Sequence, residues 1–347
     1  MSHMLDEIRE QPEIVRNIIN TQYKCVEELG AAIAKRDIRF AFIAARGASE
    51  NAAYYAKYLL EIEHRIPVAL AAPSVFTLYD AIPQFDEHAL VIGISASGAA
   101  PDALAVVQKA RDSGALTVGI TNNADSPLAK GTDFALVTPA GEELSVSATK
   151  TFTAALAMLA MLSTSLMPER PERLEHLRRT ADVMEKTLHL GDAVQHLVGR
   201  YKTMSDCVVI GRGYSRCTAR EVAHKITETC YVSTKAFSAA DFLHGPIAQV
   251  GEGFPVILIA PDGKAYQFMN DLCATIKPRH PAIIALARNP DFLTGIETAI
   301  RIPGNVPEWL SPLVYTVAGQ LFAHWLCVAR DLDPDRPRGL SKTVLTT

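Results

Sequence analysis

The sequence predicts an α/β protein of two tandem three-layer domains, in which helices cover both faces of parallel sheets and which arose by internal duplication. Short, uniformly apolar runs alternate with helix-length segments, a pattern typical of βαβ units. The second half repeats motifs of the first half in the same order. The size of 347 residues, with 48% hydrophobic and 21% charged residues, suits two folded domains.

The first half is predicted to begin with a helix over residues 12–36 and to continue as five strands joined by helices. Each strand candidate is too short and too uniformly apolar for an amphipathic helix. The strands are expected at Ile38–Ala45, Val68–Ala71, Ala89–Ile94, Leu116–Thr121 and Phe134–Val137. The helices are expected at Asn51–Ile62, Pro101–Ser113 and Thr149–Leu166.

The second half follows a charged helical segment over residues 171–201 and starts the alternation again. Its strands are expected at Cys207–Gly211, Pro255–Ala260, Ala282–Ala287 and Thr298–Ile302. Its helices are expected at Arg216–Tyr231, Lys264–Ile276 and Trp309–Arg330.

Two sequence matches support the duplication. Residues 42–49 align with residues 208–215, because each has an apolar run followed by Arg-Gly and a Ser two residues on. Residues 91–98 align with residues 256–263, where an apolar run ends in a turn closed by Gly. The two offsets agree within one residue, so a duplicated domain is the expected explanation.

The turn Ser95-Ala96-Ser97-Gly98 is a candidate anion site in the first copy. It follows an apolar strand, and Pro101 suits the first turn of the next helix. Hydroxyls and free backbone N–H groups at a helix start bind anions, and open α/β folds hold ligands at this edge of the sheet. An ordinary polar turn with a serine cap is the alternative. The second copy lacks both serines, so one half is expected to bind a phosphate.

A second polar segment, residues 142–151, precedes an apolar helix and contains Ser147 and Thr149. Either hydroxyl can simply cap that helix. The alternative is that these side chains line the same ligand as the Ser95 turn, and the local sequence leaves both open.

The second copy carries acid–base groups instead. Glu221, His224, Lys225 and Glu228 recur at helical spacing, which is also the pattern of a surface ion pair. His244 stands in a turn made by Gly245 and Pro246, a place where histidines are often functional. A histidine and a carboxylate suit proton transfer near neutral pH.

The composition excludes several classes of protein. The net charge of −4 gives no electrostatic footprint for nucleic acid. No apolar run reaches the ~18–20 residues of a membrane helix, and the amino end lacks the pattern of a secretory signal. The six cysteines are scattered, which indicates reduced thiols in a cytoplasmic protein and argues against a zinc site. They are Cys25, Cys207, Cys217, Cys230, Cys273 and Cys327.

In this order and spacing the motifs resemble the double sugar-isomerase-domain (SIS) family, whose domains are flavodoxin-like. The chain is similar in particular to the isomerase half of glucosamine-6-phosphate synthases and to the SIS-fold glucosamine-6-phosphate deaminases. The resemblance runs from about residue 5 to the carboxyl end. Its motifs are residues 46–49, 95–98 and 147–150, Lys225 with Glu228, His244-Gly245-Pro246, and the tail 333–344.

The resemblance implies the chemistry of four residues. Glu228 would move a proton between C1 and C2 of an open-chain sugar, and Lys225 would handle a proton on the amine or hydroxyl. His244 would assist ring opening from a neighbouring subunit, which implies a homodimer with shared active sites. Lys342 would engage the open-chain carbonyl. Such chemistry needs no metal or other cofactor.

The resemblance also implies a set of substrate-binding residues: Arg46, Gly47, Ser49, Ser95, Ser97, Gly98, Glu143, Ser147 and Thr149. This chain departs from the family where Ala96, Ala99 and Ala100 replace polar residues of the phosphate loop. Lower phosphate affinity or a different substrate is expected from these changes. Thr227 also stands where a second lysine is common, and Ala148 where the synthases have a serine.

The expected domains are an N-terminal helix over residues 5–36, a first SIS domain over 37–168 and a helical linker over 169–203. A second SIS domain over 204–332 and a tail over 333–347 follow. Only about 35 residues precede the first expected strand, too few for the glutaminase domain of a synthase. Glutamine-dependent amide transfer is therefore not expected of this chain.

The expected function is conversion of glucosamine 6-phosphate to fructose 6-phosphate and ammonia. The first alternative is a deaminase, deglycase or isomerase of another amino-sugar or fructosamine phosphate. The second, of another class, is a non-catalytic sugar-phosphate sensor, which would not need Glu228 as a proton shuttle.

Overall fold

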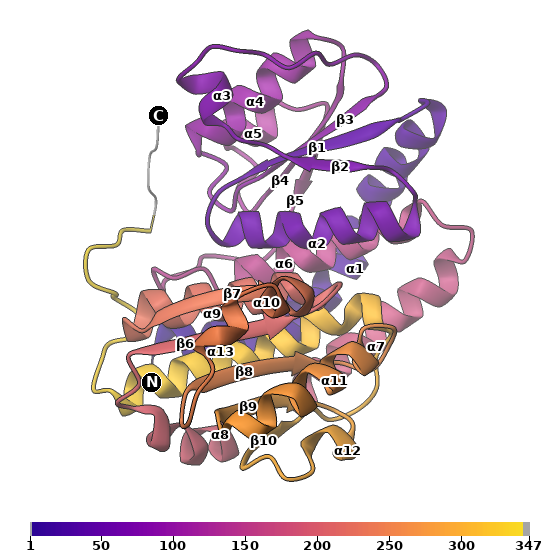
Figure 1. The fold of residues 1–347 in the computed structure, drawn as a ribbon. Coiled ribbons are helices and arrows are strands. Elements are labelled where there is room, and N and C mark those ends of the chain that lie inside the picture. Colours follow the sequence, from indigo (N-terminus) through magenta and orange to yellow (C-terminus); the bar gives the residue numbers. More distant parts are fainter. Residues whose placement is uncertain (1, 343–347) are drawn as a thin grey trace. The chain divides into compact units, whose positions relative to one another are not determined.

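The computed structural model describes residues 2–342 (Figure 1). The chain divides into two compact units, each with one five-stranded sheet. The unit that we call the first domain comprises residues 13–143, 150–178 and 341–342. The second domain comprises residues 2–12, 144–149 and 179–340.

The first domain is a parallel sheet between two layers of helices (Figure 1). Its strands are β1 (Phe40–Ala45), β2 (Val68–Leu70), β3 (Ala89–Ile94), β4 (Leu116–Thr121) and β5 (Phe134–Val137), in the order β2-β1-β3-β4-β5. Helices α2 (Ala48–Glu63) and α6 (Lys150–Ser165) lie on one face. Helices α3 (Ser74–Thr77), α4 (Pro101–Asp112) and α5 (Pro127–Lys130) cover the other face. Buried alanines and valines of β1, β3 and α4 form the core on that face.

The second domain has the same layers. Its strands are β6 (Asp206–Gly211), β7 (Ser233–Ser238), β8 (Pro255–Ala260), β9 (Ala282–Ala287) and β10 (Thr298–Arg301), in the order β10-β9-β8-β6-β7. Helices α9 (Ser215–Cys230) and α13 (Ser311–Ala329) pack on one face. Helices α10 (Ala239–Leu243), α11 (Tyr266–Ile276) and α12 (Pro290–Leu293) pack on the other.

The two sheets share one topology. In each domain the first strand lies between the second and third, and the fourth and fifth follow at the far side. All strand pairs are parallel, including β1 with β3 and β6 with β8. The predicted fold class, two duplicated parallel α/β domains, is therefore confirmed. Each domain thereby gathers the loops after its strands at one edge, where such folds bind ligands.

Strand β7 was not predicted from the sequence. It reads STKAFS and is partly exposed, since it lies at the edge of the sheet and pairs only with β6 among the described strands. An edge strand has no need of the continuous apolar run that marks a buried strand.

The helices also differ at their ends from the expected ranges. The predicted segment over 171–201 is α7 (Arg170–Leu188), α8 (Gly191–Val198) and a short 3₁₀ turn. Helix α1 (His3–Lys35) begins before Pro12, although proline lacks the N–H that the helix needs there. The side-chain amide of Gln11 donates to the carbonyl of Ile8 at 3.1 Å, which is the acceptor that Pro12 leaves without a backbone partner.

Within residues 2–342, the stretch Glu308–Ala329 is the only helical segment long and apolar enough to span a membrane. Core helices of globular domains pass the same test. Of its most apolar window, 83% is buried inside the protein, and α13 packs along α9. We therefore describe α13 as a core helix of the second domain.

Candidate active site

The predicted phosphate loop of the first domain lies between β3 and α4. The backbone N–H of Gly98 donates to the Ser95 hydroxyl at 3.1 Å, and that of Ala99 donates to the Ser97 hydroxyl at 3.3 Å. Gly98 has a φ of 64°, and a Cβ there would collide with the side chain of Ser126. The turn therefore requires glycine, and it places two hydroxyls and the amino end of α4 at the ligand-binding edge of the sheet.

The loop between β1 and α2 lies at the same edge. Gly47 has a φ of 57° and precedes α2, and Ser49 is half-buried in its first turn. The guanidinium of Arg46 donates from Nε to Oδ2 of buried Asp102 at 2.8 Å. This ion pair orients Arg46 beside the first turn of α4 and leaves about half of its side chain exposed. Asp102 was not predicted, although an acidic residue directly after the helix-initiating Pro101 was the available signal.

Glu143 and Lys342 of the first domain form an ion pair. Lys342 Nζ lies 2.6 Å from Glu143 Oε2. The same buried carboxylate accepts from the backbone N–H of Thr151 at 3.0 Å and from its hydroxyl at 2.8 Å, at the start of α6. The structure thus joins a residue predicted to bind substrate with the lysine predicted to be catalytic. The last five residues of the predicted tail lie outside the described part of the chain.

In the second domain a cluster forms around Glu228 on α9. Its Oε1 lies 2.8 Å from Nε2 of His224, one helical turn earlier. Its Oε2 accepts from the Ser147 hydroxyl at 2.5 Å. Lys225 Nζ donates to the same Ser147 hydroxyl at 2.8 Å and also to the carbonyl of Ala148. Ser147 therefore connects the predicted base with the predicted catalytic lysine.

The side chains of this cluster differ in their exposure to solvent. The side chains of Glu228 and His224 are 22% and 31% exposed, so both can meet a ligand. Lys225 is 1% exposed, and Ser147 and Thr149 are also buried. Thr149 donates to the Ser147 carbonyl at 3.0 Å. The position of Glu228 is thus stabilised on its buried side by Lys225, Ser147 and Thr149. The predicted contacts of these three residues with substrate stay predictions.

The charges of Glu228 and His224 reinforce each other. Burial acts to raise the pKa of Glu228, but the hydrogen bond and charge of His224, the charge of Lys225 and the Ser147 hydroxyl outweigh it and lower the pKa to about 2. Burial acts to lower the pKa of His224, but its bond to Glu228 and the charges of Glu221 and Glu228 raise it. The pair therefore favours a carboxylate beside an imidazolium.

Two buried side chains of α1 brace the loop over residues 144–149. Glu7 accepts hydrogen bonds from the backbone N–H groups of Leu144 and Ser145 and from the Ser145 hydroxyl. Gln11 donates to Gln320 at 2.7 Å. Sequence reasoning missed these residues, although polar side chains four apart on an otherwise apolar helix face were a usable signal.

Gln11 is connected to the loop over residues 144–149 by a further hydrogen bond. Gln320 donates to the Thr149 carbonyl at 3.2 Å, so the amide of Gln11 acts on the loop through Gln320. Asp335 in the tail accepts from the backbone N–H groups of His3 and Met4 at 2.8 Å, and its carbonyl accepts from Val146. Helix α1, the tail and the Ser147 loop thus form one network within the second domain.

His244 ends α10 and is exposed. Within residues 2–342 its side chain makes no hydrogen bond to the Glu228 cluster. Its predicted contribution to a neighbouring subunit's site stays a prediction. In the same range no three His, Cys, Asp or Glu side chains gather as metal ligands, and the six cysteines are unbridged.

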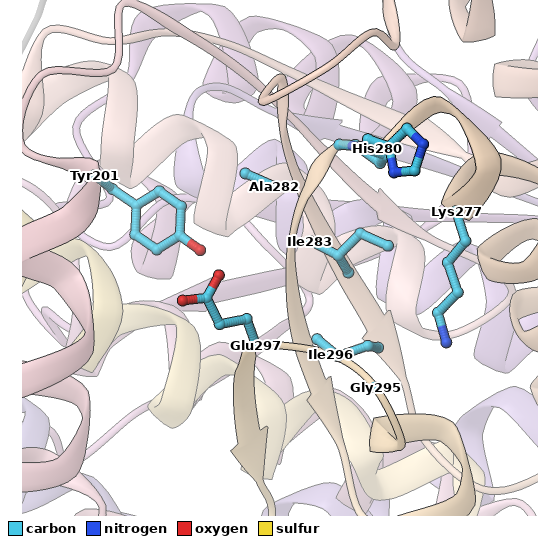
Figure 2. Close-up of a pocket in the computed structure, with 9 residues that line it drawn as sticks. Tyr201, Lys277, His280, Ala282, Ile283, Gly295, Ile296 and Glu297 are labelled. Atoms are coloured by element: carbon cyan, nitrogen blue, oxygen red, sulfur yellow. The ribbon is translucent and has the colours of Figure 1, made fainter.

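A cavity of about 270 Å³ lies elsewhere in the second domain (Figure 2). Its walls include Tyr201, His280 and Glu297, and it adjoins the amino ends of β9 and β10. None of the predicted site residues lines it. Because open α/β sheets bind ligands at the carboxyl ends of their strands, we do not assign the active site to this cavity.

Comparison with known proteins follows the same division of the chain. The model of the SIS domain matches twice, over residues 36–165 and 205–330. The chain belongs to the SIS family. It is 34% identical over 350 residues to a glutamine–fructose-6-phosphate aminotransferase (isomerizing) of Thermococcus kodakarensis. That match covers 98% of this chain and 57% of the relative, so the SIS chain spans little more than half the length of that enzyme.

Solved structures share the fold. The C-terminal domain of the glucosamine-fructose-6-phosphate aminotransferase of Francisella tularensis superposes with a TM-score of 0.86 at 24% identity, covering 97% of this chain and 98% of that domain. A glucosamine-6-phosphate deaminase of Thermotoga maritima superposes with a TM-score of 0.74 at 22% identity, covering 99% and 100%. Proteins of both names thus share the fold of this chain.

Proposed function

We propose that this chain is an aldose–ketose isomerase of sugar phosphates and that it deaminates glucosamine 6-phosphate to fructose 6-phosphate. One observation carries the proposal. Glu228 is an ionised carboxylate, accessible to a ligand, and fixed at both oxygens by His224 and Ser147. Isomerisation needs one such carboxylate along C1–C2 of the open-chain sugar.

In the proposed reaction Glu228 takes the proton from C2, and the electrons of the C–H bond form a C1–C2 double bond. The π electrons of the C1 carbonyl move to its oxygen, which takes up a proton from solvent and gives an enolamine. Protonation at C1 then gives an imine at C2. Water adds to this imine, and ammonia leaves, so one water is consumed for each ammonia released. The imidazole of His224 contacts Glu228 directly, so its positive charge stabilises the carboxylate before Glu228 takes the proton and after Glu228 releases it.

The two domains have different tasks in this proposal. The first domain recognises the phosphate through Ser95, Ser97 and the amino end of α4, since hydroxyls and free N–H groups suit an anion. Lys342, which forms an ion pair with Glu143, is proposed to engage the carbonyl of the open-chain sugar. Family membership and the relatives' names support these tasks.

One observation favours a second substrate class. Ala96, Ala99 and Ala100 provide no side-chain donors around the phosphate loop. A galactosamine or fructosamine phosphate, whose remaining groups supply the binding energy, is therefore the second candidate. It would use the same proton shuttle.

We also infer that the protein works in the cytoplasm as a homodimer. The exposed His244 supports the homodimer, because a catalytic histidine that makes no hydrogen bond to the Glu228 cluster within residues 2–342 fits a role in the neighbouring subunit. Gel filtration tests it: a dimer is expected, and a monomer at catalytic concentrations would contradict a shared site.

The proposal is tested by ammonia release from glucosamine 6-phosphate, followed through glutamate dehydrogenase. The wild-type chain should release ammonia, and Glu228→Gln should not. Galactosamine and fructosamine phosphates, assayed in parallel, separate the two substrate classes. Tight binding of all three without turnover would contradict the enzyme and indicate a sensor.

A further inference from the structure

The second domain contains its own copy of the phosphate loop, and a carboxylate of the same domain occupies it. The loop follows β8 and leads into α11. The backbone N–H of Lys264 donates to Oε2 of Glu308 at 2.8 Å, and that of Ala265 donates to Oε1 at 3.1 Å. Glu308 begins the 3₁₀ turn before α13, far along the chain. Two consecutive N–H groups at a helix start thus hold the two oxygens of one anion.

Gly263 makes this approach possible. It aligns with Gly98 of the first domain and has a φ of 137°. A Cβ at Gly263 would collide with the carboxyl group of Glu308, whereas a Cβ at Gly98 would collide with Ser126. The duplicated glycine is thus used in the first domain for the turn itself and in the second domain for contact with the anion.

The adjoining turn of the second domain keeps the other parts of an anion site. Gly213 lies against Ala265, since a Cβ on Gly213 would be 4.0 Å from that of Ala265. Ser215, the counterpart of Ser49, is 1% exposed, and its hydroxyl has no hydrogen-bond partner in the described chain. A buried hydroxyl without a partner is rare, and an ion or water beside it is one explanation of such a group.

A cation lies in the same turn. The guanidinium of Arg212, the counterpart of Arg46, lies 3.9 Å from the centroid of the Phe268 ring in α11. In the first domain Arg46 instead pairs with Asp102 in α4. The second domain therefore retains arginine, serine and glycine at the duplicated positions, and within residues 2–342 its arginine contacts an aromatic ring instead of a carboxylate.

We propose that Glu308 is a resident ligand that closes a second oxyanion site, and that removing its carboxylate opens this site to inorganic phosphate or sulfate. The site would take a tetrahedral oxyanion or a phosphate monoester, because two consecutive backbone N–H groups at a helix start donate to it, and Ser215 and Arg212 stand in the adjoining turn. The duplication thus leaves two anion sites, one for a ligand and one filled by the chain. This inference does not depend on the proposed reaction.

The test is the effect of phosphate on the melting temperature at constant ionic strength, with chloride as the balancing anion. Glu308→Ala should melt a few degrees below the wild type and should regain most of that loss as phosphate replaces chloride. The control is Glu297→Ala, which removes an exposed carboxylate of the same domain and changes the net charge equally. It should respond to phosphate like the wild type. An equal phosphate response of Glu308→Ala and the wild type would overturn the proposal.

Glu308→Gln provides a second, independent test in case the alanine variant does not fold. Its neutral amide can accept with one oxygen only, so phosphate should compete with it and raise the melting temperature more than in the wild type. Ser215→Ala in the Glu308→Gln background should reduce that gain. If the Gln variant gains no more than the wild type, the site does not accept a free oxyanion and the proposal fails. Ammonia release is not part of this test, so the proposed deaminase and the second oxyanion site can fail separately.

Discussion

The loop after β3 and the loop after β8 occupy the same place in two copies of one fold, yet they bond to different groups. In the first domain the loop N–H groups donate to serine hydroxyls of the same turn, which a phosphate can displace or join. In the second domain they donate to the carboxylate of Glu308. The difference shows how a duplicated anion site can be retained in one copy and filled in the other.

The acid–base groups are found in the other domain from the open phosphate loop. The accessible cluster of Glu228 and His224 belongs to the second domain. At the corresponding strand-to-helix connection of the first domain, α2 carries no histidine–glutamate pair at this spacing. We therefore propose a division of labour in which one copy recognises the phosphate and the other moves the proton. The predictions below test this division in order of expected effect.

The largest effect is expected for Glu228→Gln. An amide cannot take the proton from carbon, so turnover should fall by about 10²- to 10⁴-fold. Binding of the sugar phosphate, measured by calorimetry, should change little because the phosphate loop is intact. The control is Glu252→Gln, an exposed residue of the same domain, which should keep full activity. Loss of binding together with turnover would contradict the division.

The next effect is expected for Ser97→Asp, which gives the first loop the residue that Asp262 provides in the second. A carboxylate beside the phosphate repels it, so KM should rise by roughly 10- to 100-fold with a smaller change in kcat. Ser97→Ala, which only removes a hydroxyl, should raise KM by less than about tenfold. A larger effect on kcat than on KM for Ser97→Asp would show that this loop takes part in the proton transfer.

A smaller effect is expected for Glu7→Gln. The buried carboxylate accepts three hydrogen bonds from the loop that carries Ser147, and an amide cannot replace all of them. The free energy of unfolding should fall by about 1–3 kcal/mol, and turnover should fall with KM unchanged. Glu10→Gln, on the exposed side of the same helix, is the control. Normal turnover in a destabilised Glu7→Gln variant would mean that the brace supports the fold alone.

The smallest effect is expected in the pH dependence of stability. The pair of His224 and Glu228 should contribute about 1 kcal/mol, as partly exposed helical ion pairs do. Glu228 has a lowered pKa, so its contribution is present above its usual value of 4.5 and is lost as the pH falls toward about 2. His224 has a raised pKa, so its contribution is present below its usual value of 6.5 and is lost as the pH rises through the folded-state pKa.

The free energy of unfolding of the wild type and of His224→Gln, measured at a series of pH values, tests these two pH dependences. The stability difference should be greatest between about pH 4.5 and 6.5, which are the usual pKa values of the two groups. It should shrink on both sides of that range. A difference that is constant from pH 4 to 9 would mean that His224 acts by packing and not by charge.

Much of the fold was predictable because its strands are buried on both faces. Eight of the nine expected strand ranges, including Ala89–Ile94 and Pro255–Ala260, match the structure at both ends or within one residue, since an uninterrupted apolar run marks such strands. The polar edge strand β7 carries no such mark. The helix ends moved by a few residues, because helix termini depend on capping contacts that periodicity does not encode.

The candidate site was predictable where its residues lie close in sequence. His224, Lys225 and Glu228 share a helix face, and the serines of the phosphate loop follow a strand directly. The long-range partners were not predictable. Glu7 reaches Ser145, and Glu308 reaches Lys264, across large sequence separations that no local pattern reports. The burial of Lys225 was hidden for the same reason, because the Ser147 loop that covers it lies far away in the chain.

The most direct test of the division between the domains is exchange of carbon-bound hydrogen with solvent. Fructose 6-phosphate is incubated with the protein in deuterium oxide, and the C1 proton signal is followed by nuclear magnetic resonance. The account predicts that the wild type exchanges this proton, that Glu228→Gln binds the sugar but does not exchange it, and that Ser97→Asp exchanges it at high substrate concentration. Exchange by Glu228→Gln at the wild-type rate would contradict the account.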